Sequence, residues 1–306
     1  ATEPPSPNNS GSWWKAGLTF APDGQSVVAS TLNTLTVCRV SDGSELASHA
    51  IDMDGRGVGF PLAIAQHTNW VAVGESGRRL RVIDLTGGNE IFRATTSGSW
   101  IETVALSGDG QILASSSGTD ETVVHLWNVA SGRELGLLEG HRGFVSALVF
   151  WPDGRTLASA GADKTIRIWD VGTRRPLRVL RGQKGEIHRL ALLPDNSTLI
   201  SGARDGSVMV WTDVKIPRRQ ATVLSWKAGP HQMVPGAQHY DWAAFWSLAS
   251  DGNAILTLDP DGWLRRRHGR DFQETETLFR VDADPLEVRF SRDQRWLATR
   301  TGAGEV

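Results

Sequence analysis

The sequence predicts an all-β protein made of repeated four-stranded sheets, and three observations carry this prediction. A pattern of turn and strand residues recurs along the chain, with 41 to 56 residues between successive copies. The chain holds 13 Trp but a single Tyr, and Trp stands at the same place in three copies. The clear copies divide into four short strands. Four-stranded units that repeat every ~40–45 residues are typical of a β-propeller.

The clearest copy spans residues 148–180. Its first strand ends at the Pro-Asp-Gly turn of residues 152–154, where the proline ring presets the backbone for a tight turn. A second strand over 156–159 follows at the distance of a hairpin. A third strand over 165–171 and a fourth near 177–180 complete the unit.

Seven copies align by that turn, so we predict a seven-bladed β-propeller of four-stranded antiparallel blades over residues 13–306. Blade starts are expected near residues 13, 58, 100, 144, 186, 242 and 284. Residues 1–12 are rich in Pro, Ser and Asn, which indicates a linker. The equivalent turn position is held by Asp23, Thr68, Asp109, Asp153, Asp195, Asp251 and Asp293.

The seventh copy ends early, because Val306 aligns with the start of the third strand. We therefore expect the seventh blade to be incomplete in this chain and to lack its outer two strands. Residues 1–12 hold three prolines and few β formers, so they are poor candidates for the missing strands. Since open strand edges invite pairing with other chains, we expect the full protein to continue past Val306.

The third strands carry a recurring dipeptide, which reads Trp127-Asn128, Trp169-Asp170 and Trp211-Thr212 in copies three to five. On these motifs the chain resembles the WD-repeat (WD40) β-propeller family, over nearly its whole length after residue 13. The resemblance is clear in copies three to five and weak in copies two and six. Arg supplies 27 of the 32 basic residues, which indicates a GC-rich genome and a bacterial member.

Copy four contains Ser, His and Asp, the residue types of a hydrolase triad. A catalytic serine needs a strained, exposed turn and an oxyanion hole, yet Ser159 lies inside a predicted strand and the sequence has no G-x-S-x-G elbow. In proteins that this sequence resembles, the residues at these positions form a buried hydrogen-bond network. We therefore expect no catalytic residue here, and a structural tetrad of His141, Ser159, Asp163 and Trp169.

The remaining candidate chemistry is weak. The turns Asp52–Gly55 and Asp259–Gly262 lack the carboxylates of a calcium loop, and the His residues show no metal-ligand spacing, so we expect no metal. No phosphate-binding glycine loop is present, and we expect no cofactor. For the basic run Arg265–His268 we favour a solvated or ion-paired strand over a phosphate or acidic-partner contact.

Composition also narrows the partners and the compartment. A net charge of −2 disfavours broad nucleic-acid binding, and the chain has no apolar run long enough for a membrane span. The single cysteine, Cys38, excludes an internal disulfide framework and is compatible with a reducing compartment, so we expect a cytoplasmic protein.

The resemblance to WD-repeat proteins also implies where a partner binds. In that family the residues that flank the start of each first strand point to the favoured face. An insertion over residues 226–241 is expected to rise on the same face. The aromatic residues at these flanking positions can instead be buried between blades, and the insertion can have no role in binding. The predicted partner-binding residues are Trp13, Phe60, Trp100, Glu102, Phe144, Glu186, His188, Arg204, Tyr240 and Trp242.

Together these features predict a non-catalytic scaffold that binds a protein or peptide through one face of the propeller. One alternative is a sensor propeller fused to a bacterial kinase or NTPase. Another is a propeller enzyme with a site in the central channel, which would need clustered acids, His or metal ligands there.

Overall fold

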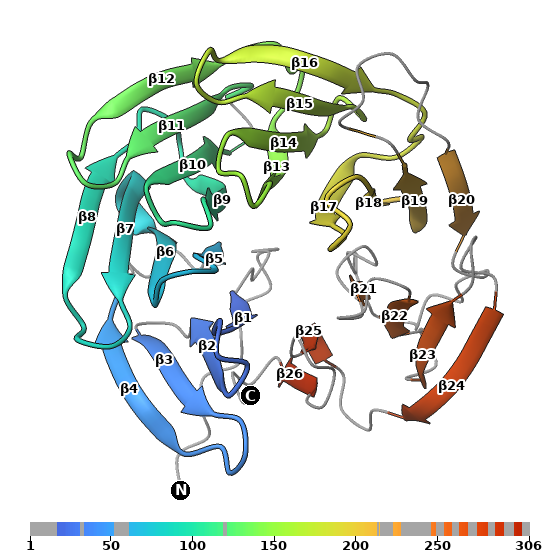
Figure 1. Cartoon of the computed structure of the whole chain (residues 1–306), viewed down its shortest axis with the longest axis horizontal. Helices are drawn as coiled ribbons and strands as arrows, with labels where there is room; N and C mark the ends of the chain where they lie inside the picture. Colours follow the sequence, from blue (N-terminus) through green and yellow to red (C-terminus); the bar gives the residue numbers. More distant parts are fainter. Residues whose placement is uncertain are drawn as a thin grey trace, which may run out of the picture.

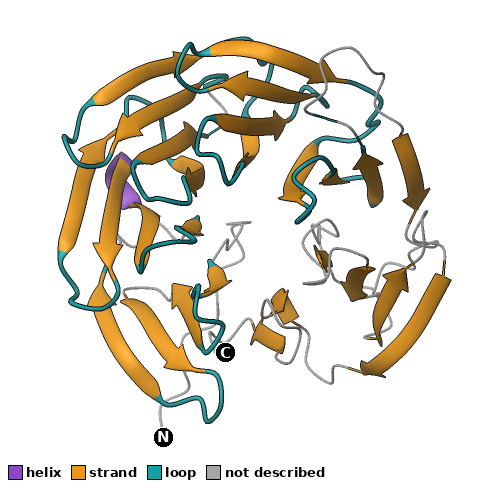
Figure 2. Ribbon diagram, viewed as in Figure 1, coloured by secondary structure: helices purple, strands orange, loops and turns teal. Residues whose placement is uncertain are grey.

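The computed structural model describes residues 17–30, 34–51, 61–118, 121–212, 214, 223–227, 246–248, 254–258, 263–268, 274–280, 285–290 and 297–301. Antiparallel sheets stand around a common centre, with the first strand of each sheet innermost and the fourth at the rim (Figure 1). Strands form nearly all of the regular structure, and the one helix in the described part is the 3-10 turn η1 (Ser76–Arg78) (Figure 2).

Six sheets have four strands each, in chain order across the sheet, and we call them blades one to six. Blade one holds β1 (Leu18–Phe20), β2 (Ser26–Ser30), β3 (Thr34–Arg39) and β4 (Glu45–Ala50). Blade two holds β5 (Leu62–Ile64), β6 (Trp70–Glu75), β7 (Arg79–Asp84) and β8 (Glu90–Thr95). Blade three holds β9 (Ile101–Leu106), β10 (Ile112–Ser117), β11 (Val124–Asn128) and β12 (Glu134–Leu138).

The second half of the ring follows the same order. Blade four holds β13 (Val145–Phe150), β14 (Thr156–Gly161), β15 (Ile166–Asp170) and β16 (Arg175–Leu180). Blade five holds β17 (Ile187–Leu192), β18 (Leu199–Ala203), β19 (Ser207–Trp211) and β20 (Val223–Lys227). Blade six holds β21 (Trp246–Leu248), β22 (Ala254–Leu258), β23 (Trp263–His268) and β24 (Glu274–Arg280).

The prediction of seven blades is wrong, because the described strands form six four-stranded blades. The seventh copy of the repeat gives only a two-stranded sheet of β25 (Pro285–Phe290) and β26 (Leu297–Thr301). This hairpin lies between blades six and one, with β25 against β21 and β1 (Figure 1). Ala298 of β26 packs on Leu18 and Val27 of blade one. The sequence count took each strand-turn-strand pattern for a blade, but a two-stranded hairpin lacks the outer pair that makes one.

The apolar core lies between neighbouring blades. Strands such as β14 are buried along their whole length because both faces of a blade pack on another blade. Leu80 and Val82 of blade two join one core cluster with Leu113 and Trp127 of blade three. Equivalent clusters join blades one and two, three and four, and four and five. Each blade is therefore positioned by its neighbours.

The recurring turn aspartate has a local structural cause. Asp153 Oδ1 accepts hydrogen bonds from the backbone N–H groups of Arg155 and Thr156, at 2.9 and 3.0 Å, and Oδ2 accepts one from the Thr156 hydroxyl. Asp23 and Asp195 make the same three bonds in blades one and five. An aspartate that closes its own turn in this way favours a tight hairpin, which explains why it marks the repeat.

Arginine side chains link neighbouring blades near the rim. Arg174 Nη1 donates to the carbonyl oxygen of Leu135 in blade three, at 2.8 Å. Arg178 Nη1 donates to the carbonyl oxygen of Val214, at 3.3 Å. The long, forked guanidinium group suits these bonds better than an ammonium group does. Part of the arginine surplus therefore has a structural use.

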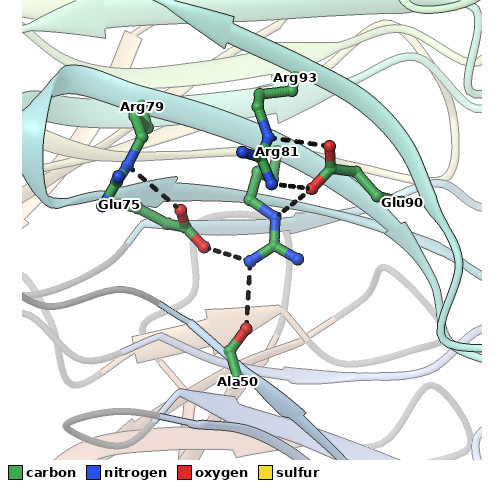
Figure 3. Close-up of polar contacts among 6 residues, drawn as sticks. All are labelled: Ala50, Glu75, Arg79, Arg81, Glu90 and Arg93. Atoms are coloured by element: carbon green, nitrogen blue, oxygen red, sulfur yellow. Dashed lines mark hydrogen bonds and ion pairs between the residues drawn. The ribbon is translucent and has the colours of Figure 1, made fainter.

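Blade two contains a network of charged residues at its junction with blade one (Figure 3). The Glu75 carboxylate is buried and accepts hydrogen bonds from Arg81 Nη1, at 2.7 Å. Arg81 also donates to Glu90, at 2.8 Å, and to the carbonyl oxygen of Ala50 in blade one, at 3.1 Å. Hydrogen bonds and charge from Arg93, together with Arg81, lower the pKa of Glu90 against the effect of burial. The network compensates the buried charge of Glu75 and joins the two blades.

Candidate functional site

The four residues grouped in copy four lie in one chain of hydrogen bonds. His141 Nδ1 lies 2.9 Å from Asp163 Oδ2, and His141 Nε2 lies 2.7 Å from Ser159 Oγ. Trp169 Nε1 donates to the same Ser159 oxygen, at 2.7 Å. The network joins the loop before β13 to β14 and β15, which are the second and third strands of blade four.

Only one proton arrangement of a neutral His141 satisfies every group. The indole N–H of Trp169 can only donate, so Ser159 Oγ accepts from it and gives its own proton to His141 Nε2. His141 Nδ1 then carries the ring proton and donates it to Asp163. This order of Ser, His and Asp resembles a hydrolase triad, but Ser159 and Trp169 are fully buried. The serine oxygen already accepts the hydrogen bond from the indole N–H. A nucleophile needs access to its substrate, and this hydroxyl has none.

The carboxylate of Asp163 completes the network. Burial would raise its pKa, but hydrogen bonds from His141, Thr165 and the backbone N–H of Arg142 hold the pKa well below the usual aspartate range. Thr165 donates its hydroxyl to Asp163 Oδ1, at 2.8 Å. The carboxylate therefore stays ionised and keeps its partners in place.

Blade five builds a longer version of the same network. Trp211 Nε1 donates to Ser201 Oγ, at 2.8 Å, and Ser201 Oγ donates to Gln183 Oε1, at 2.8 Å. Gln183 Nε2 then donates to Ser207 Oγ, at 2.7 Å, and Ser207 is bonded to Asp205. Gln183 stands where blade four has His141, and the part played by Ser207 was not predicted from the sequence. In blade four, Thr165 likewise stands two residues after the aspartate and bonds to it. This shared position was the sequence signal that could have identified Ser207.

Blade three keeps the bond from Trp127 Nε1 to Ser115 Oγ, at 3.0 Å. A second feature was missed from the sequence: His125, two residues before this Trp, lies between two carboxylates. Its Nδ1 is 2.6 Å from Glu134 Oε1 and its Nε2 is 3.2 Å from Glu121 Oε2. The imidazole also stacks on the Trp127 ring, with centroids 5.9 Å apart. Blade three thus uses a different His to join its third and fourth strands.

Blade six replaces the indole with a guanidinium group. Arg267 stands at the Trp position of β23, and its Nε donates to Thr257 Oγ1, at 3.2 Å. Thr257 holds the place of Ser159 and Ser201, since the strand registers match. Arg267 Nη1 also donates to Thr275 Oγ1 of β24, at 3.3 Å, and burial lowers its pKa. Within the basic run Arg265–His268, this arginine binds the second and fourth strands of its own blade.

We expect Arg267→Leu to lower the free energy of unfolding by about 1 kcal/mol, because the Thr257 hydroxyl loses its donor. Arg267→Trp is expected to retain the bond, since an indole N–H makes it in blades three to five. Urea unfolding in a double-mutant cycle with Thr257→Val measures the coupling between the two side chains. Strictly additive effects of Arg267→Leu and Thr257→Val would contradict this assignment.

The predicted partner-binding face is described in blades three to five. Trp100, Phe144 and Glu186 hold equivalent positions just before the first strands. Their carbonyl oxygens accept hydrogen bonds from the backbone N–H groups of Gly118, Ala162 and Arg204, at 2.8, 3.0 and 2.8 Å. These three residues therefore lie on the same face of the ring. Trp13, Phe60, Tyr240 and Trp242, with the insertion at residues 228–241, lie outside the described residues.

The side chains at this face differ from blade to blade. Trp100 is 36% exposed, Phe144 is half-buried, and Glu186 forms an ion pair with Arg204, at 3.4 Å. Glu186 also lies 3.7 Å from His188 Nε2. Trp100 Nε1 donates to Glu102 Oε2, at 3.1 Å. The structure thus brings together an aromatic and charged surface over blades three to five.

A half-open pocket of about 200 Å³, lined mostly by apolar side chains and by backbone groups, lies along the first strands of blades two to four. Its described lining holds no ionisable side chain, and Gln66 is the polar side chain there. Acid-base chemistry has no group to use in this pocket. It is lined by Leu62, Ala63, Ile64, Gln66, Val104, Ala105, Leu106, Gly108, Leu148, Val149, Phe150, Trp151 and Pro152.

The described residues contain no group of three or more His, Cys, Asp or Glu side chains placed to hold a metal ion. The turns at Asp52–Gly55 and Asp259–Gly262 lie outside them. No helix in the described part of the chain is long and apolar enough to cross a bilayer.

The fold and the Trp-hydroxyl bonds define a β-propeller stabilised by repeated polar networks. Residues 132–170 and 174–212 match the family model "WD domain, G-beta repeat". The chain therefore carries WD40 repeats, and the prediction of WD repeats is confirmed for these segments. They cover the outer strand of blade three, all four strands of blade four and the first three strands of blade five.

Several known proteins are similar to parts of the chain. A 50-residue segment, 16% of the chain, is 48% identical to DDB1- and CUL4-associated factor 13 of Dictyostelium discoideum, over 11% of that protein. An uncharacterized WD repeat-containing protein of Synechocystis sp. is 29% identical over 45% of the chain and 39% of its own length. A periodic tryptophan protein 2 homolog of Neurospora crassa is 40% identical over 20% of the chain and 7% of its own length. The matched segments thus span less than half of each relative.

Proposed function

We propose that this protein is a non-catalytic scaffold that binds protein partners through the face over blades three to five. The observation that carries the proposal is the equivalent placement of Trp100, Phe144 and Glu186 above three blades that hold one another rigidly. Exposed aromatic side chains on a rigid support are typical of binding hot spots, since little conformational entropy is lost on binding.

The WD40 repeats support the same proposal, because proteins built from such repeats typically serve as protein-interaction scaffolds. One relative, by its name, is a factor associated with two other proteins, DDB1 and CUL4. The buried Ser159 and the lining of the pocket support a protein without chemistry of its own.

We also propose a bacterial, cytoplasmic protein. The similarity to the Synechocystis protein supports the origin. The single cysteine of the chain, Cys38, supports a reducing compartment, where thiols remain unpaired. Cell fractionation with an antibody against the chain tests the location, and recovery in a membrane or extracellular fraction would refute it.

We expect Trp100→Ala and Phe144→Ala each to lower the recovery of a partner at least tenfold in an affinity pull-down from cell lysate. Both changes remove aromatic contact area from the face and leave the tetrads intact. Leu177→Ala is the matched control, since Leu177 is the most exposed large apolar side chain among the described residues, at 57%, and lies on the outer strand β16. If partners are lost with Leu177→Ala but retained with both face variants, the chosen face is wrong.

A further inference from the structure

The indole of Trp100 is held in one orientation before any partner arrives. A side-chain carbon built on Gly118 would lie 2.3 Å from Trp100 Cε2 and 2.5 Å from Cζ2, so the ring rests on the bare backbone of this glycine. The indole N–H is fixed by its hydrogen bond to Glu102, at 3.1 Å. The equivalent loop residue is Ala162 in blade four and Arg204 in blade five. Of blades three, four and five, only blade three has a glycine at this loop position and so has room for a flat ring against the backbone.

One carboxylate lies at the edge of this ring, since Glu102 accepts the hydrogen bond from the indole N–H. A second carboxylate, Glu121, belongs to the neighbouring loop and lies against Gly98, where an added side-chain carbon would meet its carboxyl carbon at 2.9 Å. Glu121 accepts hydrogen bonds from the Ser97 hydroxyl, at 3.0 Å, and from His125, at 3.2 Å. Arg78 donates to the carbonyl oxygen of Ser97 and makes no hydrogen bond to either carboxylate in the described part of the chain.

A ring face beside fixed carboxylates has a defined chemical preference. The quadrupole of an indole attracts a cation placed over its face, and a carboxylate at the ring edge strengthens the attraction. An acidic group at the same place would meet like charge, which is unfavourable across an interface. Because the ring and both carboxylates are already positioned, a partner loses little entropy in using them.

We propose that Trp100, Glu102 and Glu121 form a binding site for a positively charged side chain, Arg or Lys, of the protein partner. This inference rests on the proposed function, because it names the chemistry of a partner that binds the same face. The cation lies over the indole and faces the carboxylates. Phe144, Glu186 and Arg204 contact other parts of the partner.

The test is selection of a random heptapeptide display library on the immobilised full chain. Peptides with Arg or Lys are expected to be enriched. Their affinity is expected to fall about tenfold in Trp100→Ala and in Glu102→Gln, and less in Trp100→Phe, which keeps an aromatic face. Glu102→Lys is expected to reverse the preference, and added salt to weaken binding because exposed charges are screened. Circular dichroism and thermal unfolding confirm that each variant is folded.

The outcomes separate the two proposals. Enriched peptides that lack Arg and Lys, but lose affinity in Phe144→Ala or Arg204→Ala, would overturn the cation site and leave the binding face standing. Basic peptides that bind Trp100→Ala and Glu102→Gln as well as the unchanged chain would also overturn it. If no selected peptide depends on any of these residues, both the cation site and the proposed function fail.

Discussion

Replacing Arg81 with Met is expected to lower the free energy of unfolding by about 3 kcal/mol, because it leaves the buried Glu75 carboxylate without its main partner. The Glu75 side chain is 2% exposed, so water cannot take the place of the guanidinium group. The same change removes the bond from Arg81 to the Ala50 carbonyl oxygen and loosens the junction of blades one and two. Urea unfolding followed by tryptophan fluorescence measures the effect.

Arg93→Met provides a matched control. Arg93 binds the same Glu90 carboxylate, at 2.7 Å, but its side chain is 60% exposed. Exposed ion pairs contribute little to stability, so this variant should unfold close to the unchanged chain. Glu75→Gln should partly rescue Arg81→Met, since a neutral amide costs less to bury than an unpaired charge. Equal losses of stability in Arg81→Met and Arg93→Met would show that the buried carboxylate is not the cause.

Replacing His141 with Ala is expected to lower the free energy of unfolding by about 2 kcal/mol, because the Ser159 hydroxyl loses its acceptor and Asp163 loses a donor. His141 is 5% exposed, so the deleted ring also leaves a cavity. The midpoint of thermal unfolding should fall. Affinity for a partner should stay nearly unchanged, since the network lies beneath the face.

His141→Gln tests the mechanism further. Blade five shows that Gln can take the proton of the serine and donate to a hydroxyl two residues after the aspartate. Thr165 stands at that position in blade four. His141→Gln should therefore be less destabilising than His141→Ala in the same assay. A folded His141→Ala variant that loses most of its partner affinity would instead indicate that the tetrad takes part in binding.

The repeat was predictable because its signals are local. The aspartate of each clear turn closes its own hairpin within three residues, as Asp153 and Asp195 do. Trp169 and Ser159 belong to adjacent strands, ten residues apart in the chain, so a fixed spacing brings them together. The residues of the blade-four network could be named from the sequence because the resemblance to WD-repeat proteins implies a buried network at these positions.

The contacts that were not predicted lie between residues whose amino-acid types give no sign in the sequence that they bind each other. The basic run Arg265–His268 was predicted to be a solvated or ion-paired strand, but the bond from Arg267 to Thr257 depends on the register of β22 and β23. Glu75 was not singled out, since only the packing of blade one against blade two buries it. The blade count failed for a related reason: two strands of a repeat are visible in the sequence, but whether they become a blade depends on an outer pair.

The four-stranded repeat and its turns can be read from the sequence, because each depends on residues close together in the chain. Tertiary packing places the hairpin of β25 and β26 between blades six and one, puts a guanidinium group in the place of an indole in blade six, and lays Trp100 flat on Gly118 beside Glu102. These features depend on the space and charge that packed neighbours leave to a side chain, and no local pattern encodes them.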